Sequence, residues 1–151
     1  MNSILIRQAV LADLESVVPL FDAYRRFYGK ATDLPGARRF LRERFEHGQS
    51  VIYLALDNQT LAGFTQLYPS FSSTSMARVF ILNDLFVSQT HRRRGVASAL
   101  LQAATGHAQA FGAVRVTLNT DIGNATAQAT YEARGWRRDR EFYAYHFTPH
   151  A

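Results

Sequence analysis

The stretch HRRRGVASALL, residues 91–101, runs from three consecutive arginines through a glycine into a leucine-rich pattern. Its apolar residues recur at helical spacing as far as Phe111, which predicts a helix over residues 95–111 that ends at Gly112. The first N–H groups of a helix have no intrahelical partners and carry about half a positive charge, so they attract anions. Gly95 allows a phosphate oxygen to approach the main chain, and arginines add charge-assisted hydrogen bonds. The stretch therefore predicts a phosphate-binding loop that leads into a packed helix.

Upstream of this loop, the hydrophobic pattern predicts strands and two helices. Runs of β-branched and aromatic residues predict strands over residues 3–8, 50–56, 61–69 and 77–87. Asp57 and Asn58 suit a hairpin turn, and the small polar residues 70–77 predict a loop. Helical spacing predicts helices over residues 12–28 and 37–46. Pro19 lies inside the first of these, where it removes a backbone hydrogen bond, and predicts a kink or a break into two pieces.

Downstream of the loop, the pattern predicts a strand over residues 113–120 and a short alanine-rich helix over residues 124–133. The alternating aromatic residues of EFYAYHF, residues 141–147, predict a last strand. The order of elements is βα(α)βββαβαβ, without an internal repeat, linker or low-complexity segment. This order predicts a single α/β domain over residues 1–151.

Composition limits the chemistry and the partners. The chain has 151 residues, of which 47% are hydrophobic, enough for one well-buried core. The absence of cysteine excludes disulfides, zinc–thiolate sites and a cysteine nucleophile, and favours a cytoplasmic protein. We expect no signal peptide and no membrane segment, because no apolar run approaches the ~20 residues of a membrane span.

Charge narrows the partners further. The formal net charge of +5 favours an anionic partner, which is nucleic acid, a membrane surface or a phosphorylated cofactor. Composition alone does not choose among these three. His47, His91 and His107 lack the spacing of metal ligands, so we expect no metal site.

Three spaced motifs carry a resemblance to a known family. HRRRGVA fits the pattern Arg/Gln-x-x-Gly-x-Gly/Ala, with Arg92, Gly95 and Ala97 at the specified positions. NDLFV covers residues 83–87, and LNTDIGNATAQATYEARGW covers residues 118–136. The three motifs resemble parts of the GCN5-related N-acetyltransferase (GNAT) superfamily. The first resembles its pyrophosphate signature and the second its fourth strand. The third resembles its fifth strand, followed by an asparagine-bearing loop and a helix with a tyrosine. The resemblance covers essentially the whole chain and implies a mixed, mostly antiparallel central sheet flanked by helices.

The resemblance implies acetyl-CoA as the cosubstrate. In the family, the pantetheine arm lies between splayed fourth and fifth strands, which implies that it pairs with the main chain of Leu85, Phe86 and Val87. The loop and the first helical turn would hold the pyrophosphate, and Asn124, which also suits a helix cap, would bond to the cofactor arm. The implied pyrophosphate-binding residues are Arg92, Arg93, Arg94, Gly95, Val96, Ala97 and Ser98.

The resemblance also implies catalytic residues. Tyr131 occupies the place of family tyrosines that donate a proton to the departing thiolate. Some relatives carry a glutamate base on the fourth strand, but Asn83 holds that place here and cannot act as a base. Asp84 follows it, although strand alternation sends its side chain to the opposite face unless a bulge re-aims it. A water relay is the alternative to Asp84 as the base.

We expect the acceptor to contact the first helical region, the loop after the third strand and Asn83. Aromatic faces attract ammonium groups, and hydroxyls orient them or a carboxylate, although the same aromatic residues also suit a core. The candidate residues are Tyr24, Phe27, Tyr28, Tyr68, Ser70, Phe71, Ser72, Ser73 and Asn83.

These observations predict an acetyl-CoA-dependent N-acetyltransferase that acts on a primary amine of a small molecule, such as an amino acid, a polyamine or a related metabolite. The alternatives are acetylation of protein lysines or N-termini, a CoA-binding domain without turnover, and a basic nucleic-acid-binding module. The last lacks a recognisable reading motif, so we expect neither a nucleic acid nor a membrane as partner. Relatives often form dimers, which leaves a homodimer as an open expectation.

Overall fold

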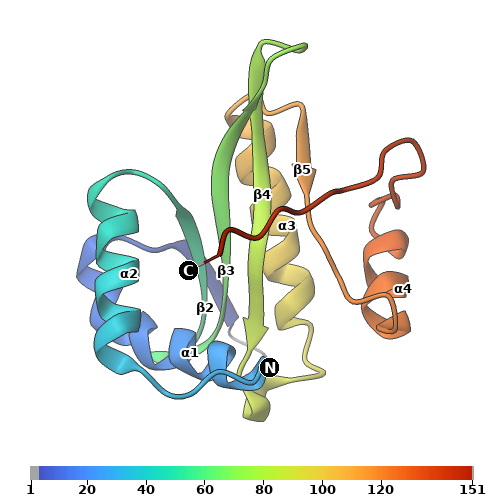
Figure 1. Ribbon diagram of the computed structural model, residues 1–151. Helices are drawn as coiled ribbons and strands as arrows, with labels where there is room; N and C mark the ends of the chain where they lie inside the picture. Colours follow the sequence, from blue (N-terminus) through green and yellow to red (C-terminus); the bar gives the residue numbers. More distant parts are fainter. Residues whose placement is uncertain (1–3, 151) are drawn as a thin grey trace. The chain divides into compact units, whose positions relative to one another are not determined.

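The computed structural model describes residues 4–150. They form two compact units, of which one ends at Leu118 and the other begins at Asn119. The first unit contains the sheet and the longer helices, and the second contains one short helix (Figure 1). No helix within residues 4–150 is both long enough and apolar enough to cross a membrane. The single domain expected over residues 1–151 stays a prediction.

The strands form one sheet in the order β1-β2-β3-β4-β5. β1 to β4 pair as antiparallel neighbours, whereas β4 and β5 are parallel. The β3–β4 hairpin is long and extends beyond the other strands (Figure 1). The strand bounds are β1 Ile4–Gln8, β2 Val51–Asp57, β3 Thr60–Ser72, β4 Ala77–Val87 and β5 Arg115–Thr117.

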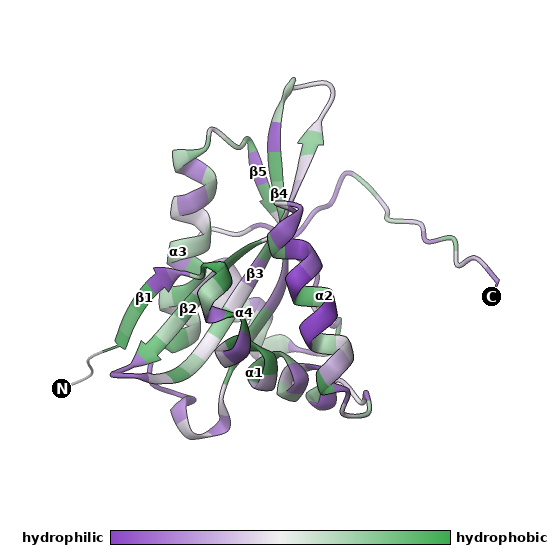
Figure 2. Ribbon diagram, turned by 90° about the vertical axis from the view of Figure 1, so that its left-hand side faces the viewer, coloured by the Kyte–Doolittle hydropathy of each residue, from purple (hydrophilic) through white to green (hydrophobic). Residues whose placement is uncertain are grey.

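Helices cover both faces of this sheet. α1 (Leu14–Phe27) and α2 (Leu34–Glu46) pack on one face over Ile52, Leu54 and Phe64. α3 (Val96–Ala110) packs on the other face and supplies the crossover that a parallel strand pair requires (Figure 1). α2 is largely hydrophilic, and its buried residues are Ala37 and Leu41 (Figure 2). Each fully buried leucine or phenylalanine side chain stabilises the fold by about 1.5–3 kcal/mol.

The remaining elements are short. The two 3-10 helices η1 (Leu11–Asp13) and η2 (Gln89–His91) precede α1 and the arginine–glycine loop. In the second unit, α4 (Ala125–Ala133) begins at Asn124, whose side chain accepts the N–H of Ala127. The mixed sheet with helices on both faces confirms the predicted fold class.

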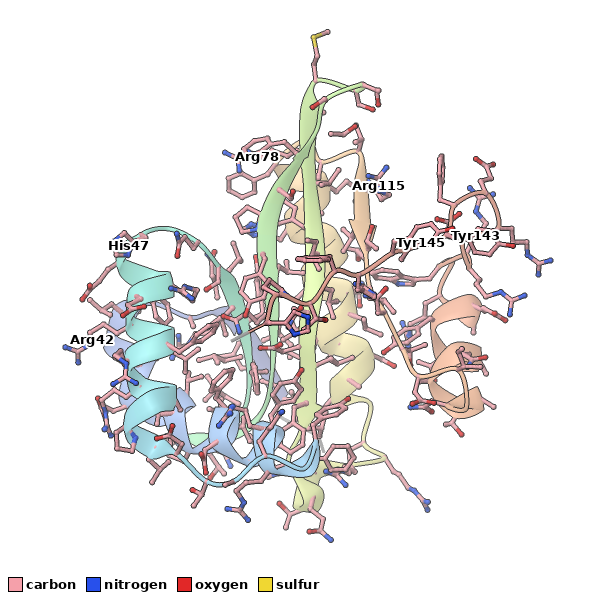
Figure 3. The ribbon with its side chains drawn as sticks, viewed as in Figure 1. Arg42, His47, Arg78, Arg115, Tyr143 and Tyr145 are labelled. Atoms are coloured by element: carbon pink, nitrogen blue, oxygen red, sulfur yellow. The ribbon has the colours of Figure 1, made fainter. Side chains whose placement is uncertain are left out.

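Three strand predictions were wrong in extent or existence. The loop expected over residues 70–77 shrinks to residues 73–76, because β3 continues to Ser72 and β4 begins at Ala77. β5 has three residues instead of the eight predicted over 113–120. Residues 141–147 form no strand, and Tyr143 and Tyr145 are each 91% exposed (Figure 3). Alternation alone does not make a strand, since main-chain groups need a neighbouring strand to bond with.

Two helix predictions also need correction. α1 is one continuous helix, so the break expected at Pro19 does not occur. Pro19 is exposed and lies in the second turn of α1. Because proline has no N–H, the carbonyl group four residues earlier loses its intrahelical donor, and this carbonyl lies near the start of the helix. α2 begins at Leu34 instead of Ala37, because Asp33 caps it by accepting the N–H of Gly36 at 3.0 Å and Pro35 fits the first turn.

Candidate active site

β4 has an open edge in its C-terminal half. β3 pairs with β4 as far as Val87, whereas β5 pairs only with Val79–Ile81. Within residues 4–118, no strand pairs with the other edge of residues 82–87. Main-chain N–H and C=O groups on such an edge can bind an extended ligand as an added strand. This is the segment in which the sequence places Leu85, Phe86 and Val87 beside the pantetheine arm.

An extra residue in β4 sets the direction of the Asp84 side chain. Gln66 of β3 lies opposite Asp84, whereas Leu67 lies opposite Leu82, so Asn83 is the additional residue of a β-bulge. Side chains alternate along a strand, and the extra residue therefore moves Asp84 to the face of Gln66, which α1 and α2 cover. The structure contains the bulge that sequence reasoning required for Asp84 to face the acceptor side.

Donors surround the carboxylate of Asp84, which is only 2% exposed. Its Oδ2 accepts a hydrogen bond from Gln66 Nε2 at 2.5 Å, and its Oδ1 accepts one from Asn83 Nδ2 at 2.8 Å. The hydroxyl of Thr65 donates to the main-chain oxygen of Asp84 at 2.7 Å. The hydroxyl of Tyr24 donates to the main-chain oxygen of Asn83 at 3.3 Å. The carboxylate is held in one orientation from β3 and β4.

Burial makes this carboxyl a stronger proton acceptor than a surface aspartate. Burial raises the pKa of Asp84 above its usual range, while the hydrogen bonds from Asn83 and Gln66 and the nearby Tyr24 hydroxyl oppose the rise. Burial and the charge of Asp84 raise the pKa values of Tyr24 and Tyr68, so both phenols stay neutral around pH 7. A buried carboxyl with a raised pKa, next to a strand edge that can bind a ligand, is typical of a general base.

Aromatic rings from α1 lie beside the open end of β4. The ring of Tyr24 meets those of Tyr28 and Phe86 at centroid distances of 5.2 and 5.9 Å, and Phe27 meets Phe86 at 6.0 Å. These rings border a groove of about 270 Å³. The groove is lined by Phe27, Tyr28, Leu85, Phe86, Val87 and Arg92. The structure thus brings together α1 aromatics, the β4 segment and one loop arginine.

Arg92 lies across this groove. Its Nε donates to the main-chain oxygen of Val87 at 3.1 Å, and its guanidinium carbon lies 5.5 Å from the ring centre of Phe27 and 5.7 Å from that of Phe86. A guanidinium over aromatic faces gains about 0.5–2 kcal/mol per contact, depending on solvent exposure. Arg92 therefore connects the arginine–glycine loop to the end of β4.

The loop delivers uncapped N–H groups at the start of α3. Gly95 is the N-cap residue with φ of 78°, and no side chain caps the helix. Arg93 is a non-glycine residue with φ of 61°, a conformation that costs about 1–3 kcal/mol and clusters at ligand-binding loops. The N–H groups of Val96, Ala97 and Ser98 open the helix, which gives the arrangement that favours a bound phosphate.

His91 ties this loop to the rest of the sheet. The His91 side chain is buried, with Nδ1 2.7 Å from Ser88 Oγ and Nε2 3.1 Å from Asp57 Oδ2. Asp57, at the end of β2, also lies 3.8 Å from Arg94 Nη2. These contacts fix the loop against the β2–β3 hairpin, which is a role that the sequence analysis did not assign to His91.

The second unit holds the other predicted residues. Asn124 uses Oδ1 to cap α4, so its NH₂ group is the part that can donate elsewhere. Tyr131 is half-buried, its ring lies 6.1 Å from that of Trp136, and its main-chain oxygen accepts the N–H of Trp136 at 3.0 Å. The structure describes this unit by itself.

Part of the predicted acceptor surface is distant from Asp84. Tyr68 lies on the same face as Asp84, two residues beyond Gln66. Ser72 is six residues beyond Gln66, which is about 20 Å along a strand, and Ser70, Phe71 and Ser73 belong to the same outer part of the hairpin. Arg78 lies over the ring of Phe71 there, at 5.5 Å (Figure 3). Four of the candidates therefore sit away from the buried carboxylate.

Comparison with known proteins decides the family. Residues 17–136 match the model of the acetyltransferase (GNAT) family. The chain belongs to the GNAT family. It is 47% identical over 140 residues to the uncharacterized N-acetyltransferase YhfO of Bacillus subtilis (strain 168), which covers 93% of this chain and 94% of that protein. The resemblance seen in the three motifs is confirmed, and the protein is an N-acetyltransferase of this family.

Solved structures agree with this assignment. A probable acetyltransferase is 45% identical and superposes with a TM-score of 0.92, covering 97% of this chain and 99% of that one. The aminoglycoside N-acetyltransferase AAC(6')-Iy, solved in complex with CoA, has 19% identity and a TM-score of 0.79, covering 97% of this chain and 96% of that one. The second likeness concerns the fold alone. Members of the GNAT family use acetyl-CoA.

Within this GNAT chain, sequence reasoning missed Gln66. Gln66 is the one amide side chain in the apolar run LAGFTQLYP. A polar side chain in such a run needs a hydrogen-bonding partner when it is buried, and this signal could have pointed to its contact with another buried polar group. Among residues 4–150, no three His, Asp or Glu side chains gather as metal ligands.

Proposed function

We propose that this GNAT enzyme transfers the acetyl group of acetyl-CoA to a primary amine of a small molecule. The observation that carries the proposal is the buried Asp84, re-aimed by the bulge at Asn83, within the open segment of β4. The aminoglycoside N-acetyltransferase of similar fold, by its name, acts on a small molecule. An acceptor site bounded by α1 aromatics suits a compact amine better than an extended peptide, since Phe27, Tyr28 and Arg92 line the same groove.

The residues fit the proposed cosubstrate. Main-chain groups of Leu85, Phe86 and Val87 can pair with an amide-containing arm, and the α3 N-terminus with its arginines can hold a pyrophosphate. The groove of about 270 Å³ adjoins both features, since Leu85, Phe86 and Val87 of β4 and Arg92 of the loop line it. When bound, acetyl-CoA supplies an acetyl thioester, whose C–S bond breaks as the C–N bond forms.

The proposed roles of the side chains concern protons. A primary ammonium with a pKa near 10.4 must lose a proton before its nitrogen can attack, which costs roughly 4–5 kcal/mol at pH 7. Asp84 accepts this proton, directly or through a water, because burial raises its pKa. Tyr131 donates a proton to the departing thiolate, and Asn124 donates its NH₂ group to the cofactor arm. The ammonium loses two protons in all. The first passes to Asp84 before attack and then to water, and the second leaves the nitrogen after attack and replaces the proton that Tyr131 gives to sulfur.

Cosubstrate binding is tested by thermal unfolding with acetyl-CoA, with free CoA and without ligand. At about 100 times the dissociation constant, a ligand that binds only the folded state adds ~2.7 kcal/mol of stability. We expect both ligands to raise Tm. An unchanged Tm together with a negative direct binding measurement would remove the cosubstrate from the proposal.

Catalysis is tested by thiol release with a panel of amino acids, polyamines and aminoglycosides beside lysine-bearing peptides. We expect one of the small amines to be acetylated, with Asp84→Asn and Tyr131→Phe each lowering kcat/KM by about 10²–10⁴-fold. Affinity for CoA should stay near the wild-type value in both variants. A faster reaction with peptides than with every small amine would move the acceptor to proteins, and an unaltered rate in Asp84→Asn would favour a water relay.

A further inference from the structure

Gln66 is a fully buried amide in contact with the carboxylate of Asp84. Its side chain is 0% exposed, and its Nε2 donates to Asp84 Oδ2 at 2.5 Å. It reaches that carboxylate because the bulge at Asn83 brings Asp84 opposite Gln66 in the β3–β4 register. The contact joins two buried polar side chains across the strands on the face that α1 and α2 cover.

The other atom of this amide has no partner. Gln66 Oε1 is buried and makes no hydrogen bond with any described residue. Buried acceptors without partners are uncommon in folded proteins, because burial removes them from water without a replacement bond. The unpaired Oε1 is attached to the same amide group that holds Asp84, so the two observations concern one structural unit.

The present arrangement suits only the charged carboxylate. Asp84 Oδ2 faces the N–H of Gln66 and Oδ1 faces the N–H of Asn83. After Asp84 takes up a proton, one of these oxygens becomes a donor that faces another donor. Rotation of the Gln66 amide by 180° exchanges Nε2 with Oε1 and places an acceptor opposite Oδ2. One amide atom is unpaired in either orientation, and the bond to the charged carboxylate is the stronger of the two because it is charge-assisted.

We propose that Gln66 is a positioning residue for the reaction, whose amide donates to Asp84 when that side chain is charged and rotates to accept from it when it is protonated. This inference rests on the proposed role of Asp84 as the base. The proton moves from the acceptor ammonium to Asp84 Oδ2, directly or through a water, and leaves to water after product release. Gln66 carries no proton itself and keeps the carboxyl group aimed in both states.

Few other groups act on Asp84 among the described residues. From α1, the hydroxyl of Tyr24 faces the bulge, and from β3, Tyr68 lies close enough for the charge of Asp84 to raise its pKa. Arg44 of α2 acts on Tyr68. Both phenols stay neutral below pH 9, because their pKa values are raised. A titration in the range of a carboxyl therefore reports on Asp84 and its amide partners.

The test follows both partners by NMR across the titration of Asp84 in the full-length protein. The Asp84 carboxyl carbon is assigned by its loss in Asp84→Asn, and the side-chain amide of Gln66 by its loss in Gln66→Met. We expect the two wild-type signals to change with the same midpoint, and the Gln66 amide to be independent of pH in Asp84→Asn. A Gln66 amide that does not respond while Asp84 titrates would overturn the proposal.

Variants supply a second readout. Gln66→Met removes the donor that favours the charged form, so we expect Asp84 to titrate at higher pH and the acidic limb of the kcat/KM profile to move the same way. Thr65→Val is the matched control, since Thr65 is equally buried and bonds only to the main-chain oxygen of Asp84. It should leave the Asp84 midpoint in place. An Asp84 midpoint that is unchanged in Gln66→Met would contradict the inference.

The two proposals fail in different ways. If the wild type acetylates no amine but the two NMR titrations coincide, the coupling of Gln66 to Asp84 stands and the proposed acceptor class falls. If an amine is acetylated and the Gln66 amide ignores the protonation of Asp84, the acetyltransferase proposal stands and the role of Gln66 falls. Should Gln66→Met not fold, the Gln66 amide is assigned through its connection to the residue's own main-chain signals, and the wild-type titration then decides.

Discussion

At Asp84, strand alternation and strand pairing give opposite answers about the direction of the side chain. Counting along NDLFV places Asn83 on the acceptor side and Asp84 behind the sheet. The β3–β4 register instead inserts Asn83 as an extra residue and turns Asp84 toward Gln66. A bulge depends on how two strands align, and no residue of NDLFV specifies it locally. The residue that could act as a base is therefore set by pairing and not by motif.

The protonation of Asp84 should appear in the stability of the protein. Its pKa is raised by burial in the folded state, whereas an unfolded aspartate has a pKa of about 3.9. The folded state then binds more protons than the unfolded state, so stability is lost as the pH rises from the unfolded pKa through the folded pKa. We expect the wild type to lose stability relative to Asp84→Asn over this interval, measured by urea unfolding between pH 4 and 8.

The comparison with Asp84→Asn isolates this one group. Asp13 and Asp22 have pKa values lowered by hydrogen bonds, mainly from Arg7 and from the N–H of Asp33, and they contribute the opposite slope. Their contribution is the same in both proteins and cancels in the difference. A difference in free energy of unfolding that does not vary with pH would show that Asp84 has an ordinary pKa.

At the scale of elements, local pattern located most of the helices and strands but not their limits. Helix α3 and strand β4 match the sequence prediction within a residue at each end. In both, the apolar periodicity stops where a glycine or polar residues begin, so two local signals mark the same limits. The extent of β3 and β5 was wrong, since strand length depends on how far a neighbour runs alongside. The aromatic alternation of residues 141–147 indicated a strand, but within residues 119–150 these residues form none.

Gly63 allows β3 and β4 to approach each other behind the groove. A Cβ atom at this position would lie 2.8 Å from the main-chain oxygen of Phe86 and 3.3 Å from Val96 Cγ1. Gly63→Ala should therefore destabilise the protein by about 1–3 kcal/mol and weaken CoA binding, because the β4 main chain must shift. Thermal unfolding and a CoA titration measure the two effects.

Gly106 offers the matched control for this substitution. It lies inside α3, is exposed, and has open space around the position of a Cβ atom. Gly106→Ala should stabilise the protein by about 1 kcal/mol, because alanine has the higher helix propensity. It should leave CoA affinity unchanged. If Gly63→Ala stabilised the protein as Gly106→Ala is expected to do, the close approach at Gly63 would not limit packing.

For the whole molecule, sequence reasoning assembled the site in outline. It assigned the arginine–glycine loop and the end of β4 to acetyl-CoA and the α1 aromatics to the acceptor, and residues of all three line one groove. It could not find Gln66 or the His91–Asp57 contact, because these pairs join distant segments and neither forms a motif. Local motifs identify where the cosubstrate is expected, whereas pairing across strands decides which side chains support the chemistry.

Two pairs among the 17 lysines and arginines of the chain should differ in function. All four side chains are exposed, but Arg93 and Arg94 lie in the loop directly before the uncapped N-terminus of α3, whereas Arg137 and Arg138 belong to the second unit. Exposed, solvated arginines contribute about 0–1 kcal/mol each to ionic contacts. We therefore expect Arg137→Gln with Arg138→Gln to leave the ratio of the affinities for CoA and dephospho-CoA, which lacks the 3′-phosphate, at its wild-type value.

The loop pair gives the contrasting result. Arg93→Gln with Arg94→Gln should weaken binding of both ligands by about tenfold or more, because each charge-assisted bond to phosphate is worth about 1.5–3 kcal/mol and 1.4 kcal/mol is a factor of ten. Isothermal titration measures the affinity of each protein for CoA and for dephospho-CoA. The salt concentration is held fixed, because a change in ionic strength would by itself alter these charged contacts. If the affinity ratio fell to one in the Arg137 and Arg138 variant, those arginines would bind the 3′-phosphate, and the second unit would take part in holding the cosubstrate.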